Sequence, residues 1–435
     1  MKKFLSIFFA LLMCFTVVFS YGCGNKQLDA PVITLEKSSK NGYYVASWEE
    51  NPLAINFIIN VDGVETTVKN TVTTKELRIG ETIKVKAVSD GAEYSSSEWS
   101  ESVICKAEGR SFEKFNSLAT PKYKLPGCDM LINPQSIDVS EEMGLVFVAG
   151  YYFNIKGDPE CSLWVLDLET TELLATYTIL ETDGQTRHYS YVGGLAVTEK
   201  NLFISSEGNF YRISLSKFEN PADGIVVIDE VISTHAKAAN CCYADGVLWV
   251  GDFWIDGKQA NYQIPDDRPV PVGMYEPQAW AVGYILEDTD SEISILKKDE
   301  IILDNKLYEA SFPKAPDYVL LIGEKIRGFT FQNGCVILTK SYGGVATLYF
   351  KENPILSNPN GDTTVTIDEK VVPVWNLPKS NVETIGPMSD PLQISNFNDD
   401  LLLVFGSGTK FYGKIEKTDT PTEFAWLIKF PDLSE

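Results

Sequence analysis

A pattern of apolar strands separated by polar turns recurs five times along the chain, and it constrains the fold more than any other feature. Its clearest copy has an apolar run at residues 193–198, a polar turn at 199–201 and further apolar runs at 202–206 and 210–215, and we expect residues 224–228 to close it. Repetition of one unit of this kind predicts an array of similar sheets. Equivalent positions in each copy are then expected at equivalent corners of the array.

The other copies open with the apolar runs 135–140, 239–243, 327–331 and 392–395, and together the five occupy residues 112–435. Three or four strands per copy over this length predict an all-β domain of the β-propeller type. Five copies indicate five blades. The long distance between the third and fourth copies leaves a count of six open, although residues 257–275 and 287–312 read as insertions there. A single sandwich or jelly roll is the competing architecture, but it does not explain the recurring turns.

Short alternating strands also fill residues 29–107 and predict a separate β-sandwich. Pro31 opens this segment, Trp48 stands in its second strand, the hairpin sequence 61–64 follows its third, and residues 85–88 precede a serine-rich turn. These features resemble a fibronectin type III module. The resemblance implies a spacer without catalytic residues, which we interpret as a stalk, and a binding face of its own is the alternative.

The N-terminus has the organisation of a targeting segment and is excluded from the fold. Residues 1–22 begin with lysines, continue through an apolar stretch at 4–20 and end directly before Cys23. The sequence of residues 20–23 resembles a bacterial lipobox, although the usual leucine is replaced by serine. The resemblance implies a diacylglyceryl anchor on Cys23, a tether at 23–28 and a place on the extracellular face of a bacterial membrane. Simple secretion with an unmodified Cys23 is the alternative.

Composition excludes some partners and cofactors. The chain carries a net charge of −23, and a nucleic-acid partner would require clustered lysine and arginine. Six cysteines follow Cys23 with no CxxC spacing, and the chain has only two histidines, so no structural zinc site is expected. Cys241, Cys242 and Cys335 lie in apolar strands and are expected to be buried thiols. A Cys105–Cys128 disulfide remains an alternative.

Aligning the copies places polar and aromatic side chains on one face of the predicted propeller, around its centre. These residues precede the innermost strands or lie in the loops between second and third strands. Both histidines fall at equivalent positions, and a cavity lined by polar and aromatic groups is the usual form of a ligand site. The candidate ligand-binding residues are Gln135, Tyr151, His188, Glu207, His235, Asp252, Trp254, Arg327 and Tyr342. Alternatively, the two histidines are ordinary loop residues.

The copies resemble bacterial propellers of the streptogramin-lyase-like and quinoprotein-like kind. We predict a surface-anchored binding protein that recognises a glycan, a peptide or a protein. The alternative is a metal-assisted lyase or hydrolase that uses His188 or His235. No cofactor is expected unless that alternative holds, in which case the resemblance implies a divalent metal. The acidic run at 287–292 lacks the spaced ligands of an EF-hand loop and is interpreted as a solvated loop. The identity of the ligand is left open.

Overall fold

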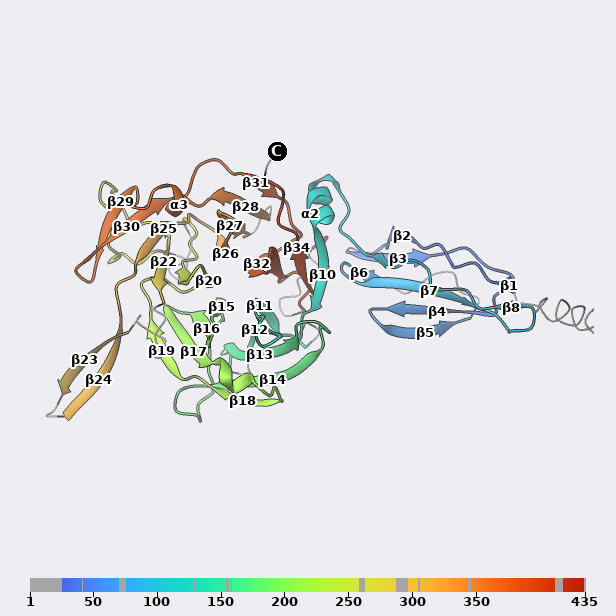
Figure 1. Ribbon diagram of the computed structural model, residues 1–435, viewed down its shortest axis with the longest axis horizontal. Coiled ribbons are helices and arrows are strands. Elements are labelled where there is room, and N and C mark those ends of the chain that lie inside the picture. The colour runs from blue at the N-terminus through green and yellow to red at the C-terminus, as the bar shows by residue number, and fades with distance from the viewer. Residues whose placement is uncertain are drawn as a thin grey trace, which may run out of the picture. The chain divides into compact units, whose positions relative to one another are not determined.

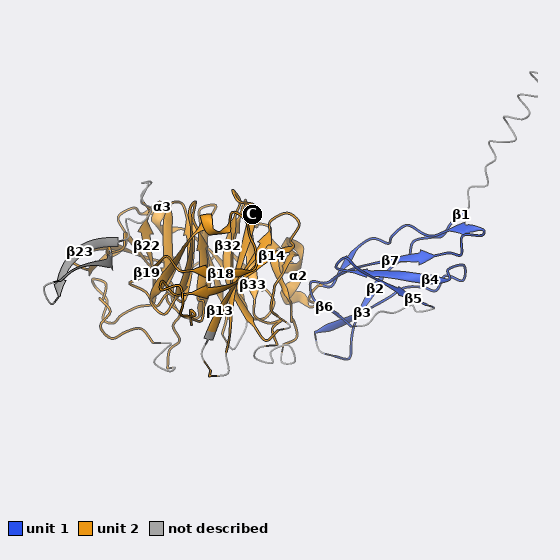
Figure 2. Ribbon diagram, turned by 90° about the horizontal axis from the view of Figure 1, so that it is seen from below, with its two compact units in different colours: residues 1–105 blue, residues 106–435 orange. Residues whose placement is uncertain are grey.

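The computed structural model describes residues 26–433 except 41, 70–75, 129, 154–155, 158, 258–262, 287–295, 304–305, 343–345 and 411–417. The predicted signal segment, Cys23 and the acidic run at 287–292 therefore lie outside the described residues. The chain divides into two compact units, residues 1–105 and residues 106–435 (Figure 2). No helix in the described part of the chain has the length and apolar character needed to span a membrane.

The first unit contains two main sheets. One has the order β2-β3-β6, the other β5-β4-β7-β9, and β1 pairs in parallel with β8. The strands are β1 (Lys26–Gln27), β2 (Thr34–Lys37), β3 (Tyr43–Ser47), β4 (Asn56–Val61), β5 (Val64–Val68), β6 (Leu77–Arg78), β7 (Thr82–Val88), β8 (Tyr94–Ser95) and β9 (Val103–Ile104).

Alternation along the strands decides which faces of these sheets are buried. In β7, Ile83, Val85 and Ala87 are fully buried, whereas the residues between them are partly exposed. Trp48 and Phe57 meet edge to face in the core, with their ring centroids 5.6 Å apart. The turn between β4 and β5 is Asp62-Gly63, and both residues have positive φ, as a two-residue hairpin turn requires.

The second unit is a β-propeller, in which sheets stand side by side around a common centre (Figure 1). Its sheets have the strand orders β11-β12-β13-β14-β18, β15-β16-β17-β19, β20-β21-β22-β25-β30-β29, β26-β27-β28-β31 and β10-β34-β33-β32, and a separate hairpin pairs β23 with β24. The innermost strands contact one another in sequence, and β32 also contacts β11, so the ring is closed. Strand β10 pairs with β34, which joins the two ends of the unit in one sheet.

The strands of this unit are β10 (Ala119–Lys124), β11 (Asn133–Ser140), β12 (Leu145–Phe153), β13 (Pro159–Asp167), β14 (Leu173–Leu180), β15 (Gly194–Val197), β16 (Asn201–Ser206), β17 (Asn209–Ser214), β18 (Gly224–Val227), β19 (Glu230–Ser233), β20 (Asn240–Ala244), β21 (Val247–Gly251), β22 (Trp280–Ile285), β23 (Leu296–Leu303), β24 (Lys306–Pro313), β25 (Tyr318–Leu321), β26 (Ile326–Gln332), β27 (Cys335–Lys340), β28 (Thr347–Glu352), β29 (Thr363–Ile367), β30 (Lys370–Asn376), β31 (Glu383–Ile385), β32 (Pro391–Phe397), β33 (Asp400–Phe405) and β34 (Phe424–Ile428). Its helices are η1 (Arg110–Phe112), α2 (Glu113–Leu118), η2 (Leu215–Phe218) and α3 (Pro354–Ser357).

Apolar faces of neighbouring sheets form the core. One cluster joins Phe147 and Val165 of the first sheet to Leu195 and Ile204 of the second. The centre of the ring is closed by Gln393 of β32, whose amide accepts from the Leu195 N–H at 2.8 Å and donates to its carbonyl at 2.5 Å. Gln393 is buried, and its neighbour Leu392, near the start of β32, lines the cavity at the end of the ring where the inner strands begin. That end holds the cavity described below.

One strand pairs differently from the prediction. Residues 224–228 were expected to close the second copy, but β18 instead adds in parallel to β14 of the preceding sheet, and β19 closes the second. The apolar residues Val226 and Ile228 are buried against Tyr177 and Phe218 there. An apolar run predicts a buried strand but does not say which sheet edge receives it.

The six cysteines of the described residues are buried thiols, so the Cys105–Cys128 disulfide is not formed. Burial raises the pKa of Cys241 to about 12, and that of Cys161 to the same value. Such thiols are protonated and unreactive at neutral pH.

Candidate functional site

A cavity of about 1400 Å³ lies in the second unit, at the end where the inner strands begin. Gln135 of β11, Gly193 before β15, Ala238 before β20, Arg327 of β26 and Leu392 of β32 all line it. Each inner strand, or the residues just before it, therefore contributes to the wall, and loops together with residues of strands such as β12, β22 and β29 supply the rest. This is the end of the propeller that the alignment of the copies indicated.

One side of the cavity, here called the Asp252 wall, consists of Asp252, Lys237, Arg268 and Trp280. The Asp252 carboxylate is fully buried and accepts from the backbone N–H of Lys237 at 2.9 Å and of Trp280 at 3.0 Å. The Arg268 guanidinium donates to it through both terminal nitrogens, one of them at 2.9 Å. A single carboxylate therefore ties together three segments of the wall.

Arg268 completes this arrangement by covering the Trp280 ring, with its guanidinium carbon 4.5 Å from the ring centroid. The Trp280 indole N–H donates to the His235 carbonyl at 2.8 Å. Both charges of the Asp252–Arg268 pair are almost completely buried. A buried ion pair is stable only when its remaining hydrogen-bonding capacity is satisfied. The backbone N–H groups of Lys237 and Trp280 satisfy it for Asp252.

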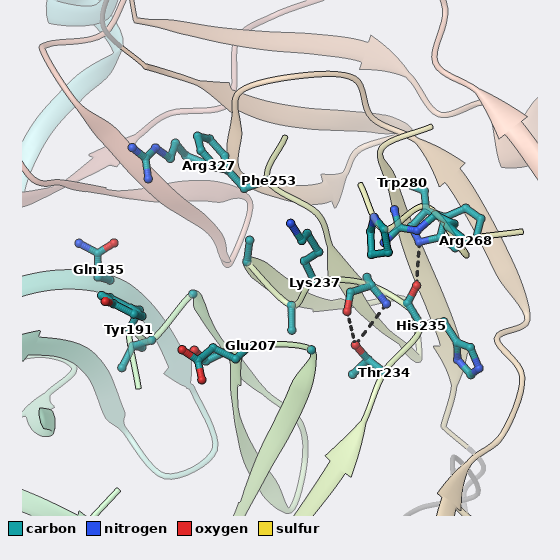
Figure 3. Close-up of a pocket in the computed structure, with 18 of the residues that line it drawn as sticks. Gln135, Tyr191, Glu207, Thr234, His235, Lys237, Phe253, Arg268, Trp280 and Arg327 are labelled. Atoms are coloured by element: carbon teal, nitrogen blue, oxygen red, sulfur yellow. Dashed lines mark hydrogen bonds between the residues drawn. The ribbon is translucent and has the colours of Figure 1, made fainter. Parts of the chain in front are cut away.

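Lys237 extends from the β19–β20 loop and is drawn in the middle of the cavity view, between Arg327 and Glu207 (Figure 3). Its ammonium group donates to the Gln263 carbonyl. Burial lowers the pKa of Lys237, and the positive charge of Arg268 lowers it further, whereas Asp252 acts in the opposite direction. A negatively charged ligand group beside Lys237 would therefore stabilise the protonated form of its amine.

His235 lines the cavity, but both of its ring nitrogens have protein partners. Nδ1 lies 2.9 Å from the Tyr284 hydroxyl, and Nε2 lies 2.8 Å from the Asp368 carboxylate. Asp368 reaches it because the β29–β30 hairpin joins the sheet of β20. In Figure 3 the imidazole lies on the side of the view away from Gln135, Tyr191 and Glu207. The hydrogen bonds of His235 therefore support the Asp252 wall through Trp280 and link it to Tyr284 and Asp368.

The opposite side, here called the aromatic wall, consists of Tyr151, Phe153 and Tyr191. The three rings meet edge to face, with centroids 5.3 to 6.1 Å apart. Phe153 is 41% exposed and Tyr191 is 46% exposed, whereas Tyr151 is buried behind them. Exposed aromatic rings at the mouth of a cavity offer large contact surfaces for the apolar faces of a ligand.

Arg327 stands on the Phe253 ring, its guanidinium carbon 4.5 Å from the ring centroid, and lies 5.7 Å from the centroid of Tyr342. Its Nε donates to the Ser341 carbonyl at 3.3 Å. No ion pair with a carboxylate involves Arg327 within the described residues. Two aromatic rings therefore hold a cation at the cavity wall.

His188 lies outside the cavity lining, although the repeat gives it the same position as His235. It is 2% exposed, its Nδ1 lies 2.9 Å from the Glu181 carboxylate, and its ring centroid lies 4.2 Å from that of Tyr211. Its buried Nε2 has no hydrogen-bond partner. Burial lowers the pKa of His188, against the opposing effect of Glu181. The structure therefore does not bring the two histidines to one site.

The other predicted residues divide into two groups. Gln135, Tyr151, Glu207 and Arg327 line the cavity together with His235. Asp252 and Tyr342 lie behind lining residues and contact them, and Trp254 is not among the lining residues, its carbonyl instead accepting from the Lys325 N–H at 2.9 Å.

Sequence reasoning missed several lining residues, namely Lys237, Phe253, Asp267, Arg268, Trp280 and Asp368. Arg268 is the one basic residue between Gln263 and Tyr275, a proline-rich stretch that was interpreted only as an insertion. This single basic side chain was the one sequence signal that could have marked the stretch as part of the site. No sequence signal indicated Asp368, because it lies in the turn of the β29–β30 hairpin, in a different part of the repeat from His235.

Across the described residues, no three His, Cys, Asp or Glu side chains are grouped closely enough to hold a metal ion. The side chains of the cavity offer cation contacts, carboxylate and amide hydrogen bonds, and aromatic surfaces.

Comparisons with known proteins add little to this description. No protein-family model and no curated protein matches the chain. Among solved structures, the GH43_1 enzyme from Xanthomonas citri complexed with xylose is 14% identical, with 74% of this chain and 92% of that chain covered and a TM-score of 0.35. A glucose dehydrogenase is 9% identical, with 93% and 97% covered and a TM-score of 0.30. The WD40 domain of Toxoplasma gondii coronin is 7% identical, with 94% and 81% covered and a TM-score of 0.27. Likenesses this distant carry no argument about activity or ligand.

Proposed function

We propose that the protein is a membrane-anchored extracellular binding protein whose propeller recognises a glycan, a peptide or a protein. The observation that carries this proposal is the cavity of about 1400 Å³, which combines exposed aromatic rings with charged side chains held in place by buried contacts. A cavity that combines apolar surface with a few fixed polar groups is the usual form of a ligand site.

The propeller of this proposal has five blades. Support comes from the five sheets of four or more strands, whose inner strands contact one another in a closed ring. The long segment between the third and fourth copies contains the β23–β24 hairpin and β25, and β25 adds to the sheet of β22. This arrangement favours an elaborated third blade over a sixth blade.

The first unit acts as a stalk of the fibronectin type III kind. Its two sheets of three and four strands and the buried pair Trp48–Phe57 support this assignment. The lipobox-like sequence before Cys23 supports an anchor on the outer face of a bacterial membrane, because two acyl chains suffice for stable attachment. Metabolic labelling with a fatty-acid analogue should mark the wild type and leave Cys23→Ser unlabelled, and equal labelling of both would contradict the anchor.

The alternative, a metal-assisted lyase or hydrolase using His188 and His235, has less support. His188 is buried outside the cavity lining, and both nitrogens of His235 are engaged by protein groups. A general base must reach the proton that it removes, and neither ring is placed to do so without rearrangement.

The proposal is tested by screening the full-length protein against glycan and peptide arrays, with two tyrosine variants beside the wild type. Tyr191 and Tyr189 are similarly exposed, at 46% and 41%, but only Tyr191 lines the cavity. Tyr191→Ala should weaken binding of the captured ligand about tenfold or more, since one lost aromatic contact is worth about 1–3 kcal/mol. Tyr189→Ala should bind as the wild type does. Equal binding by all three proteins would exclude the cavity as the site.

A further inference from the structure

We infer that the ligand of the cavity is an anionic saccharide, with its carboxylate or sulfate group bound at Arg327 and its sugar rings against the aromatic wall. This inference rests on the proposed function and names the class of ligand. Three sets of side chains lead to it: the cations, the acids and amides, and the aromatic rings of one cavity.

The first set is positive, and its two arginines differ in what they contact. Arg268 is neutralised by the buried Asp252, so its charge is already used within the protein. Arg327 rests on Phe253 and Tyr342, and within the described residues its Nε alone, of its three guanidinium nitrogens, makes a hydrogen bond. A guanidinium presents a planar fork of donors that matches a carboxylate or a sulfate. Lys237, on the same cavity, adds a second positive charge.

The second set limits which anions fit. Glu207 and Asp267 also line the cavity, and Asp368 is there in contact with His235. A small, uniformly charged anion would be repelled by Glu207 and by the overall charge of −23. A saccharide with one acidic group reduces this cost, because its hydroxyl groups donate to carboxylates while its acidic group faces Arg327. The amide of Gln135, which also lines the cavity, offers a further partner for hydroxyls.

The third set is aromatic. Phe153 and Tyr191 are nearly half exposed and supported by the buried Tyr151. Sugar rings carry apolar C–H faces alongside their hydroxyl edges, and such faces pack on aromatic rings. An aromatic wall, hydroxyl acceptors and a cation held on one cavity together match the three surfaces of an anionic sugar unit.

The test uses an array of matched oligosaccharides: uronate-containing chains, their carboxyl-reduced neutral forms, sulfated chains and unsulfated chains. The full-length wild type should bind an acidic chain at least about tenfold more tightly than its neutral counterpart, as expected for one charge-assisted contact. Whether the carboxylate or the sulfate pair shows this preference identifies the anionic group. Raising the salt concentration should reduce the preference.

Variants of Arg327 provide the residue-level test. Arg327→Gln should lose most of the preference for the acidic chain while keeping its binding of the neutral form. Arg327→Lys should recover only part of it, since an ammonium lacks the planar fork. Arg110→Gln is the matched control, because Arg110 is an exposed arginine of the same unit and does not line the cavity. Unchanged melting temperatures for these variants would show that folding is intact.

Two results overturn the inference and leave the proposed function standing: equal binding of acidic and neutral chains, or capture of peptides alone, in each case still weakened by Tyr191→Ala. Retention of the acidic preference in Arg327→Gln would also overturn it. Failure of every probe to bind, or binding that Tyr191→Ala leaves unchanged, would overturn the proposed function together with the inference.

Discussion

The two walls of the cavity are built in different ways. The Asp252 wall is held by a buried ion pair, by backbone hydrogen bonds to one carboxylate and by an arginine stacked on Trp280. The aromatic wall is formed by ring contacts, and two of its three rings are exposed to more than 40%. One wall is thus fixed by buried contacts within the protein, and the other offers accessible aromatic surface to a ligand.

The comparison predicts its largest effect for Asp252→Asn. The substitution leaves Arg268 as a buried charge without its partner, and breaking such a pair costs about 3–5 kcal/mol. Denaturant unfolding should show this loss in the free energy of unfolding. Asp267→Asn removes an exposed carboxylate one residue from Arg268 and should change it by less than about 0.5 kcal/mol. Equal, small losses for both would show that the Asp252 wall does not depend on its ion pair.

A smaller effect is expected from Tyr191→Ala. Because the ring is 46% exposed, its removal should change the free energy of unfolding by less than about 1 kcal/mol, even though it weakens ligand binding. The same denaturant series measures it. A loss as large as that of Asp252→Asn would mean that both walls are structural, and the contrast between them would fail.

The smallest effect is a pH dependence of the free energy of unfolding that originates at His188. Burial lowers the pKa of His188 below its unfolded value of 6.5. Just below pH 6.5 the unfolded chain therefore binds a proton at this residue more readily than the folded chain does. The stability gained from a neutral His188 is complete above pH 6.5 and is lost as the pH falls below that value. Unfolding measured from pH 7 to pH 5 should therefore show a steeper loss in the wild type than in His188→Gln.

Asp138 titrates in the same window with the opposite sign, because burial raises its pKa to about 7 and the folded chain takes up the proton first. Its contribution is common to the wild type and to His188→Gln, so the difference between the two proteins at each pH isolates His188. Parallel pH profiles would contradict the role given to its burial.

The sequence allowed most strands and the position of the cavity to be predicted, because both depend on local patterns. Alternating apolar residues and turn sequences such as Asp62-Gly63 act within a few residues. The contacts that make the site are non-local. Asp368 reaches His235 through a hairpin added to another sheet, and Arg268 reaches Asp252 from an insertion.

The two histidines show the limit of the repeat most clearly. Both occupy the same position in their copies, yet His188 turns into the packing around Tyr211, whereas His235 lies at the cavity. Position within a repeat fixes where the backbone is placed and leaves side-chain direction to the neighbouring residues. The predicted order of the strands in the second sheet was wrong for a similar reason, because β18 packs its apolar residues beside β14 of the first sheet.

The central claim, that ligand binds in the propeller cavity, is tested most directly by amide hydrogen exchange. The full-length protein is compared with and without the oligosaccharide that binds most tightly on the array. We expect slower exchange at residues 151–153, 191–193, 206–208, 234–239 and 325–327, with the first unit unchanged. Protection confined to the first unit, or absent from all of these segments while the ligand is bound, would contradict it.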